Sequence, residues 1–309
     1  MRAGQSMTDV IGNTPIVKLG DVVPEGSADV WVTLEWFNPT GSYKDRMALA
    51  MVEEAERRGD LTPGMTVVEY TGGSTGSSLA YVCAVKGYAF KVVSSDAFAD
   101  EKLKTMQAFG ADLTIVPSIG GRVTPDLVSR MMDVARQYAE EPGTYWTNQL
   151  HNADSIIGYQ GVGSELAAQL GTIDVFCAGV GTAGLVTGVA RALTDAGSQA
   201  RIVVLEPGSS PFITSGVAGS HGVEGIGIGF WPPLLDRDIF DESRAIHEDA
   251  AREMARRLAA EEGLLAGTST GLNVVGAIQL AEELGSGHTV ATVACDTGLK
   301  YLAGDLFAR

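Results

Sequence analysis

The sequence has few basic residues for its length. Of 309 residues, 22 are Lys or Arg and 38 are Asp or Glu, so the net charge at pH 7 is −16. Nucleic-acid phosphates and anionic lipid head groups repel such a chain, so we expect neither a nucleic acid nor a membrane surface as a partner. Long apolar runs are absent, and the start MRAGQSMTDVIGNTP lacks an apolar signal core. We therefore expect a cytoplasmic protein.

Cysteine is scarce as well. Cys83, Cys177 and Cys295 are far apart and lack metal-ligand spacing, so we expect no metal site and interpret each as a small buried residue. Proline is rare at 11 residues, whereas 39 residues are glycine and 45% are hydrophobic. This composition is that of a globular protein with sizeable cores, and the length favours two domains of roughly 150 residues each.

Short β-rich runs alternate with helical periodicity along most of the chain, which predicts parallel sheets covered by helices. The expected strands are 65–70, 90–94, 113–116, 175–178, 202–206 and 289–294. The expected helices are 77–86, 100–109, 125–138, 184–196, 250–262 and 270–284. This order favours two doubly wound α/β lobes, each with three α/β/α layers, and a ligand cleft between them.

A glycine-rich turn, GVGTAG at 179–184, joins an expected strand to an expected helix. Backbone N–H groups and the positive end of the helix suit a phosphate at such a turn. The turn also matches GxGxxG, and Glu206 ends the next expected strand, where a dinucleotide site has an acid for the ribose. A nicotinamide-dependent dehydrogenase therefore stays open as an alternative at this point.

Three more features point to one chemistry. The turn TGGSTG at 71–76 suits a small anion such as a carboxylate, and Thr297 follows the last expected strand. Lys44 follows a segment broken by Pro and Gly and begins an expected helix, where the helix dipole disfavours a cation. A pyridoxal phosphate enzyme needs a Schiff-base lysine, a phosphate site, a carboxylate site and a partner for the ring nitrogen, and this set supplies all four.

Several spaced motifs then resemble the cysteine synthase and cystathionine β-synthase family of fold-type II pyridoxal phosphate enzymes. They are IGNTP (11–15), NPTGSYKDR (38–46), EYTGGSTGSSLA (69–80), NQ (148–149), GVGTAGLVTG (179–188), VEGIGIGFWPPLLD (223–236) and CDTGLKYL (295–302). The resemblance implies a tryptophan synthase β-like fold with the cofactor in the cleft between the lobes. It also implies a larger cofactor-binding domain of residues 1–37 and 147–309, and a smaller, mobile substrate-loop domain of residues 38–146.

The resemblance implies the site residues. Lys44 is the catalytic residue, which binds pyridoxal 5'-phosphate covalently and then removes the Cα proton of the substrate. The other residues expected to bind the cofactor are Ser74, Gly179, Gly181, Thr182, Ala183, Gly184, Leu185 and Thr297. The residues expected to bind the substrate are Thr71, Gly72, Ser74, Thr75, Gln149 and Gly225.

Two turns depart from the family's motifs. The usual TSGNTG reads TGGSTG, so that Gly72 replaces a serine and Ser74 replaces an asparagine that contacts the cofactor's phenolic oxygen. The usual GTGGT reads GTAGL at 181–185, so that Leu185 replaces a hydroxyl residue. Phosphate binding is then expected to depend on backbone N–H groups and Thr182, with Thr187 as a further candidate.

The activity that the resemblance implies is β-replacement on an activated serine: O-acetylserine, O-phosphoserine or serine. An aminoacrylate intermediate then reacts with a thiol or sulfide, giving cysteine or a related amino acid. A neutral hydroxyl at Thr297 favours β-chemistry over racemisation and transamination, and Asp296 is expected to point away. β-Elimination alone, by a cysteine desulfhydrase or a serine or threonine dehydratase, stays open, as does an inactive binding module. The family also suggests a homodimer.

Overall fold

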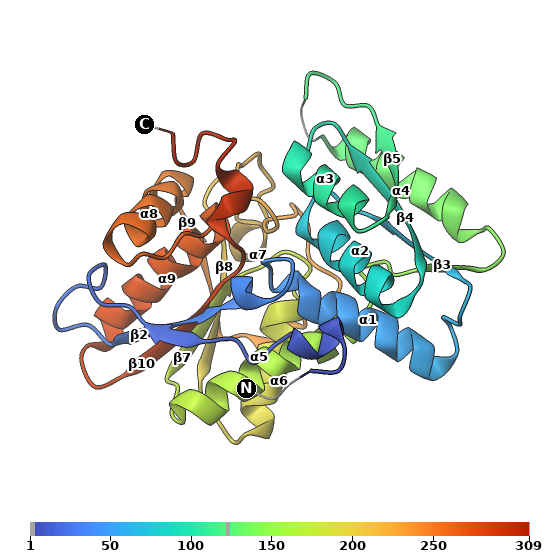
Figure 1. The fold of residues 1–309 in the computed structure, drawn as a ribbon. Coiled ribbons are helices and arrows are strands. Elements are labelled where there is room, and N and C mark those ends of the chain that lie inside the picture. The colour runs from blue at the N-terminus through green and yellow to red at the C-terminus, as the bar shows by residue number, and fades with distance from the viewer. Residues whose placement is uncertain (1–3, 122–123, 309) are drawn as a thin grey trace. The chain divides into compact units, whose positions relative to one another are not determined.

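The computed structural model describes residues 4–121 and 124–308, which divide into two compact units. Unit 1 comprises Met1–Ile11 and Lys44–Gly158, and unit 2 comprises Gly12–Tyr43 and Tyr159–Arg309. Both units have the expected α/β architecture (Figure 1).

The unit boundaries differ from the predicted domain boundaries. The resemblance implies boundaries at 37/38 and 146/147, whereas the compact units divide at 11/12, 43/44 and 158/159. The first residues lie with unit 1 because the Tyr81 hydroxyl donates to the Met7 carbonyl at 2.5 Å. Residues 147–158 lie there because Gln149 binds Glu69, and Asp154 forms an ion pair with Arg58. None of these contacts leaves a periodic signal in the sequence.

Unit 1 contains a four-stranded parallel sheet in the order β5-β4-β3-β6. The strands are β3 (Thr66–Tyr70), β4 (Ala89–Ser95), β5 (Asp112–Val116) and β6 (Thr144–Trp146). Its helices are α1 (Lys44–Arg58), α2 (Ser74–Lys86), α3 (Asp100–Ala108) and α4 (Pro125–Ala139), preceded by the 3-10 helix η1 (Met7–Val10). Most residues of β3 and β4 are buried, as expected for parallel strands that are covered on both faces.

Unit 2 contains a six-stranded sheet in the order β1-β2-β10-β7-β8-β9, in which β1 is antiparallel to β2 and the other neighbours are parallel. The strands are β1 (Ile16–Lys18), β2 (Asp29–Leu34), β7 (Val175–Gly179), β8 (Arg201–Pro207), β9 (Glu242–Ile246) and β10 (Thr289–Ala294). The helices are α6 (Gly184–Asp195), α7 (Phe212–Ser215), α8 (Glu248–Glu261) and α9 (Thr268–Leu284), with the larger part of α5 (Asp154–Leu170). The 3-10 helices are η2 (Glu35–Phe37), η3 (Arg237–Ile239) and η4 (Gly298–Tyr301). Helices α8 and α9 lie on one side of this sheet, and α6 lies on the other (Figure 1).

All the expected strands and helices are present, and six further strands and helices were not predicted: β1, β2, β6, β9, α5 and α7. Helix α5 was missed because its glycines lower helix propensity. The structure explains two of these glycines. A Cβ on Gly158 would lie 2.3 Å from the Arg46 carbonyl oxygen, and a Cβ on Gly163 would lie 2.8 Å from the Val189 carbonyl oxygen. These glycines let α5 pack closely against α1 and α6.

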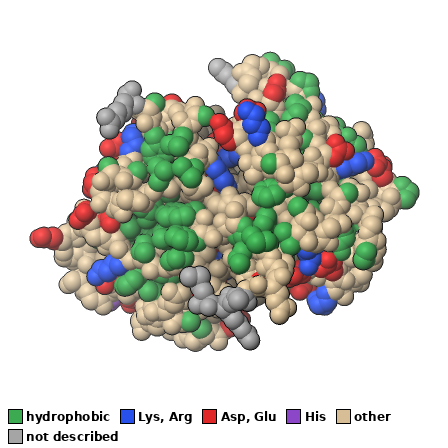
Figure 2. Space-filling view, viewed as in Figure 1, with side chains coloured by type: hydrophobic (Ala, Val, Ile, Leu, Met, Phe, Trp, Pro, Cys, Tyr) green, Lys and Arg blue, Asp and Glu red, His purple; other side chains and the backbone are tan. Residues whose placement is uncertain are grey.

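Membrane spans, cysteine burial and surface charge can be compared with the expectations from composition. No helix among the described residues is long and apolar enough to cross a membrane. Cys83, Cys177 and Cys295 are all buried, as predicted, and burial raises the pKa of the Cys83 and Cys177 thiols to about 12. On the face shown in Figure 2, Lys and Arg side chains are scattered among Asp and Glu.

The packing of α9 on α8 generates a stability prediction. A Cβ on Gly271 would lie 2.0 Å from the Ala251 carbonyl oxygen, so Gly271→Ala has to push the two helices apart. We expect a loss of about 2 kcal/mol in the free energy of unfolding, even though alanine favours the helix. Urea unfolding measures this loss. Gly20→Ala is the control, because no heavy atom lies within 4 Å of its Cβ position. Equal stability of the two variants would contradict the close packing.

Candidate active site

Lys44 is the first residue of α1, as the sequence predicts, and its side chain is half-buried. The segment before it belongs to unit 2, where the Tyr43 N–H donates to the Cys295 carbonyl and the Thr297 N–H to the Gly41 carbonyl, both at 3.0 Å. The chain therefore enters α1 directly from an anchored segment. The backbone that carries the Lys44 amine therefore has little freedom to move.

The turn at 71–76 connects β3 to α2 within unit 1. Helix α2 begins at Ser74, and its N-cap Gly73 makes no side-chain cap. The Gly73 N–H donates to Thr71 Oγ1 at 3.2 Å, and Thr75 Oγ1 donates to Gln149 Oε1 at 2.8 Å. Four of the predicted substrate-binding residues thus lie on one turn, and Gln149 is bonded to it. Hydroxyls and helix-start N–H groups of this kind suit a carboxylate.

Phe98 explains why Gly72 replaces the family's usual serine. A Cβ on Gly72 would lie 2.1 Å from Cε1 of Phe98, so the ring already fills the space of a side chain. The neighbouring Gly73 is covered in a similar way by Lys102, whose Cδ would lie 3.2 Å from a Cβ there. Lys102 is only 4% exposed.

The turn at 179–184 connects β7 to α6 within unit 2. The Gly179 N–H donates to Asn273 Oδ1 at 2.7 Å, and the Gly227 N–H donates to the Val180 carbonyl at 2.9 Å. A Cβ on Gly181 would lie 2.3 Å from the Gly225 carbonyl oxygen. The structure thus brings the predicted residue Gly225 directly against this turn, and only a glycine at 181 allows the contact.

Helix α6 starts at Gly184, and no described side chain caps it. Its N-cap Ala183 has a φ of 71°, in the left-handed region that strains a residue with a Cβ. Leu185 is buried in the core, so its N–H group is what it offers to a ligand. Thr187 was a further candidate for phosphate binding, but it is buried and its hydroxyl donates to the Leu234 carbonyl at 3.0 Å. The Thr187 hydroxyl therefore donates within the protein and is not expected to bind the phosphate.

Thr297 follows β10 and is the N-cap of η4. Its Oγ1 accepts a hydrogen bond from the Leu299 N–H at 3.3 Å. The hydroxyl proton can still be donated to an acceptor such as a ring nitrogen. The neighbouring Asp296 is 5% exposed, and its Oδ2 accepts a hydrogen bond from the Tyr301 hydroxyl at 2.8 Å.

Two buried polar residues behind these turns were not predicted. Asn273, on α9, is fully buried, and besides accepting from Gly179 it donates to the Val293 carbonyl at 2.8 Å. Glu69, on β3, is also fully buried and accepts from the Gln149 N–H at 2.9 Å. In both cases the available signal was a polar residue between two hydrophobic neighbours.

Glu206, the acid that the dehydrogenase alternative requires, has another role. Its carboxylate is 2% exposed and accepts from the N–H groups of Ile213 and Thr214, both at 2.7 Å. The Thr214 hydroxyl donates to it as well, at 2.8 Å. A carboxylate used in this way to hold α7 is not placed to bind a ribose.

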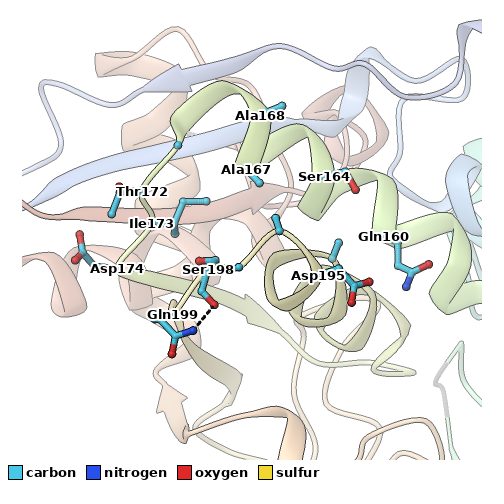
Figure 3. Close-up of a pocket in the computed structure, with 14 residues that line it drawn as sticks. Gln160, Ser164, Ala167, Ala168, Thr172, Ile173, Asp174, Asp195, Ser198 and Gln199 are labelled. Carbon is cyan, nitrogen blue, oxygen red and sulfur yellow. Dashed lines mark hydrogen bonds between the residues drawn. The ribbon is translucent and has the colours of Figure 1, made fainter.

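A separate hollow lies in unit 2, near the ends of α5 and α6 (Figure 3). Gln160, Ser164, Asp174, Asp195 and Ser198 are among the side chains that line it, and the Gln199 amide donates to the Ser198 carbonyl at 3.4 Å. The lining includes none of the predicted site residues. It does not contribute to the candidate site.

Comparison with known proteins decides the family. Residues 7–296 match the family of pyridoxal-phosphate dependent enzymes. The chain belongs to this family. It is 42% identical to a cysteine synthase of Staphylococcus aureus over 306 residues, which are 98% of this chain and 97% of that protein.

Solved structures agree with this assignment. The chain is similar to an O-ureido-L-serine synthase with a TM-score of 0.92 and 37% identity, covering 99% of this chain and 96% of that one. It is also similar to an O-acetylserine dependent cystathionine β-synthase from Helicobacter pylori, with a TM-score of 0.89 and 30% identity. This match covers 99% of this chain and 100% of that one. The predicted family, fold class and enzymatic nature are confirmed.

The residues present fit pyridoxal phosphate, the cofactor of this family. The start of α6 presents N–H groups that no described side chain caps, as a phosphate requires. Thr297 offers a hydroxyl, and Lys44 offers an amine at the start of α1. The donor set therefore matches the phosphate, the ring nitrogen and the aldehyde of the cofactor.

The strain at Ala183 generates a prediction. Because glycine adopts a positive φ without a steric cost, we expect Ala183→Gly to raise the free energy of unfolding by about 1 kcal/mol. Thermal and urea unfolding measure the change. Ala192→Gly, inside the same helix, should have the opposite sign, with a loss of about 1 kcal/mol or more. Destabilisation of similar size by both variants would show that residue 183 is not strained.

The contact between Gly72 and Phe98 generates another prediction. Gly72→Ser forces the ring to move, so it should cost about 2 kcal/mol of unfolding free energy. In a Phe98→Ala background, the same substitution should cost less than about 0.5 kcal/mol, because the space is then open. Urea unfolding of the four proteins measures the coupling. An equal cost in both backgrounds would show that the ring does not determine the residue at 72.

Proposed function

We propose that this chain catalyses pyridoxal phosphate-dependent β-replacement on an activated serine, with O-acetylserine as the first candidate. Sulfide or a thiol is the nucleophile, and cysteine or a related amino acid is the product. The observation that carries the proposal is the neutral hydroxyl of Thr297 at the end of β10, where a carboxylate would favour other reactions of this cofactor. The similarity to cysteine synthases supports the substrate class.

In this proposal, residues of unit 2 hold the phosphate and the ring nitrogen of the cofactor, and Lys44 and Ser74 of unit 1 hold its aldehyde and phenolic oxygen. Backbone N–H groups of Gly181, Ala183 and Leu185 bind its phosphate with the Thr182 hydroxyl, and Gly179 and Gly184 shape the turn. Thr297 donates to the ring nitrogen. The Lys44 amine binds the aldehyde covalently, and the Ser74 hydroxyl replaces the family's asparagine at the phenolic oxygen. When bound, the cofactor supplies an electron sink for negative charge at the substrate Cα.

Residues of unit 1 bind the substrate. Thr71, Ser74 and Thr75 hold the carboxylate at the start of α2, with Gly72 shaping the turn and Gln149 bonded to Thr75. Gly225, which belongs to unit 2, is also proposed to bind the substrate. A fixed carboxylate orients the Cα–H bond, and the Lys44 amine, released once the substrate amine has replaced it on the aldehyde, would remove that proton as a general base. We also propose that the enzyme is a cytoplasmic homodimer and that the substrate-binding domain is mobile, as the resemblance implies.

The role of Lys44 can be tested by trapping. Borohydride reduction of the protein with pyridoxal phosphate, followed by peptide mass mapping, should place the label on Lys44. Lys44→Ala should lose the label and lower kcat at least about 1,000-fold, since it removes the base. Lys104→Ala is the control, because that lysine is exposed and paired with Asp100. A label on any other residue would contradict the proposal.

The reaction products distinguish β-replacement from β-elimination. The protein is incubated with O-acetylserine, O-phosphoserine or serine, with and without sulfide or homocysteine. We expect an amino acid that contains the added sulfur, formed only when the nucleophile is present. Pyruvate and ammonia formed at the same rate with and without a thiol would show an enzyme that only eliminates.

A further inference from the structure

Glu69 is a buried carboxylate in unit 1 to which the proposed function assigns no role. It lies near the end of β3 and is 0% exposed. Its Oε2 accepts from the Thr147 hydroxyl at 2.8 Å and from the Gln149 N–H at 2.9 Å. Its Oε1 accepts from the Tyr70 N–H at 2.9 Å and from the Trp146 indole N–H at 3.4 Å. The carboxylate thus joins the end of β3 to the segment that follows β6.

The segment that it holds contains a left-handed residue. Asn148 has a φ of 45° and lies between two residues that donate to Glu69. Asparagine adopts this conformation more readily than most other residues with a Cβ. Here the carboxylate binds Thr147 on one side of Asn148 and Gln149 on the other. Asn152 adds a hydrogen bond to the Thr147 carbonyl at 2.9 Å.

The same segment carries the contact to the substrate turn. The Gln149 side chain accepts from the Thr75 hydroxyl at 2.8 Å and donates to the Tyr70 carbonyl at 3.4 Å. Both contacts depend on where the backbone of Gln149 lies, and the hydrogen bond from its N–H to Glu69 sets that place. A shift of Gln149 would therefore move or release Thr75.

The ionisation state of Glu69 affects these hydrogen bonds, because the four groups that donate to its carboxylate are all neutral. Burial raises the pKa of Glu69 to about 7, although the four hydrogen bonds lower it. Tyr70 is the neighbouring titratable group, and burial together with the charge of Glu69 raises its pKa to about 12, so it stays neutral. Protonation of Glu69 turns one oxygen into a donor that faces other donors, and hydrogen bonds are lost. The segment is therefore held most firmly above pH 7.

We propose that Glu69 is a positioning residue for substrate binding: its ionised carboxylate holds Gln149 where it accepts a hydrogen bond from Thr75. The inference rests on the proposed function, in which Thr75 and Gln149 bind the carboxylate of the amino acid. Glu69 itself touches neither substrate nor cofactor in this role. It acts on affinity, through Gln149, and not on the proton transfer at Lys44.

The direct test is Glu69→Gln in the holoenzyme. The amide keeps the size of the side chain but can no longer accept from all four donors. We expect the KM for O-acetylserine to rise about tenfold with kcat changed less than about threefold. The wild-type KM should also rise as pH falls below 7, whereas that of Glu69→Gln should not. Glu206→Gln is the control, since this buried carboxylate also accepts N–H donors but lies in unit 2.

A double substitution tests whether the effect passes through Gln149. In a Gln149→Ala background, Glu69→Gln should raise KM no further. An equal rise in both backgrounds, or an unchanged KM in Glu69→Gln alone, would overturn the proposal. Thr147→Val is the second variant if Glu69→Gln does not fold, because it removes one donor and keeps the charge. It should raise KM about threefold, and an unchanged KM would overturn the proposal.

Amide hydrogen exchange provides a readout that needs no substrate. Residues 147–152 should exchange faster in Glu69→Gln than in the wild type, and at the wild-type rate in Glu206→Gln. If wild-type enzyme reacts with no activated serine, the proposed function fails, and this measurement still decides whether Glu69 orders the segment. Unchanged exchange in Glu69→Gln would overturn the role of Glu69, whatever the activity.

Discussion

The first N–H groups of an α-helix have no carbonyl partner within the helix, and this constraint underlies the candidate site. Helices α2 and α6 each follow a parallel strand and lack a side-chain cap among the described residues, as α3, α8 and α9 also do. By contrast, Thr124 caps α4 with its own hydroxyl. The proposed function gives the starts of α2 and α6 to the substrate carboxylate and the cofactor phosphate, so that an anion takes the place of a capping side chain at these two helices.

Buried polar side chains behind the turns keep these N–H groups in place. Asn273 ties Gly179, at the base of the phosphate turn, to β10, and Glu69 ties Gln149 to β3. A buried amide or carboxylate is costly unless its hydrogen bonds are satisfied, and both residues meet this condition with several partners. Rigid turns avoid ordering the backbone when a ligand binds, so under the proposed function these two residues support affinity without touching a ligand.

The departures from the family's motifs have local physical causes. Gly72 is accommodated by the Phe98 ring, which occupies the space that a side chain would need. Ala183 keeps a left-handed backbone conformation that glycine adopts more easily, and the chain tolerates the strain at the start of α6. The Leu185 side chain packs into the core, so the proposed function assigns phosphate binding to backbone N–H groups and Thr182. The turns have therefore kept their backbone while their side chains changed.

Hydrophobic periodicity and glycine-rich turns were enough to place most strands and helices, the start of α1 at Lys44 and the three turns, because these signals are local along the chain. The motifs were also enough to identify the family. The pairing of Thr75 with Gln149, the approach of Gly225 to Gly181 and the role of Glu206 in holding α7 became known only from the structure. So did Glu69 and Asn273, because a single buried polar residue has no meaning until its partners, which lie far away in the sequence, are known. Tertiary packing decided those contacts, since it brings together backbone and side-chain groups that no periodic pattern relates.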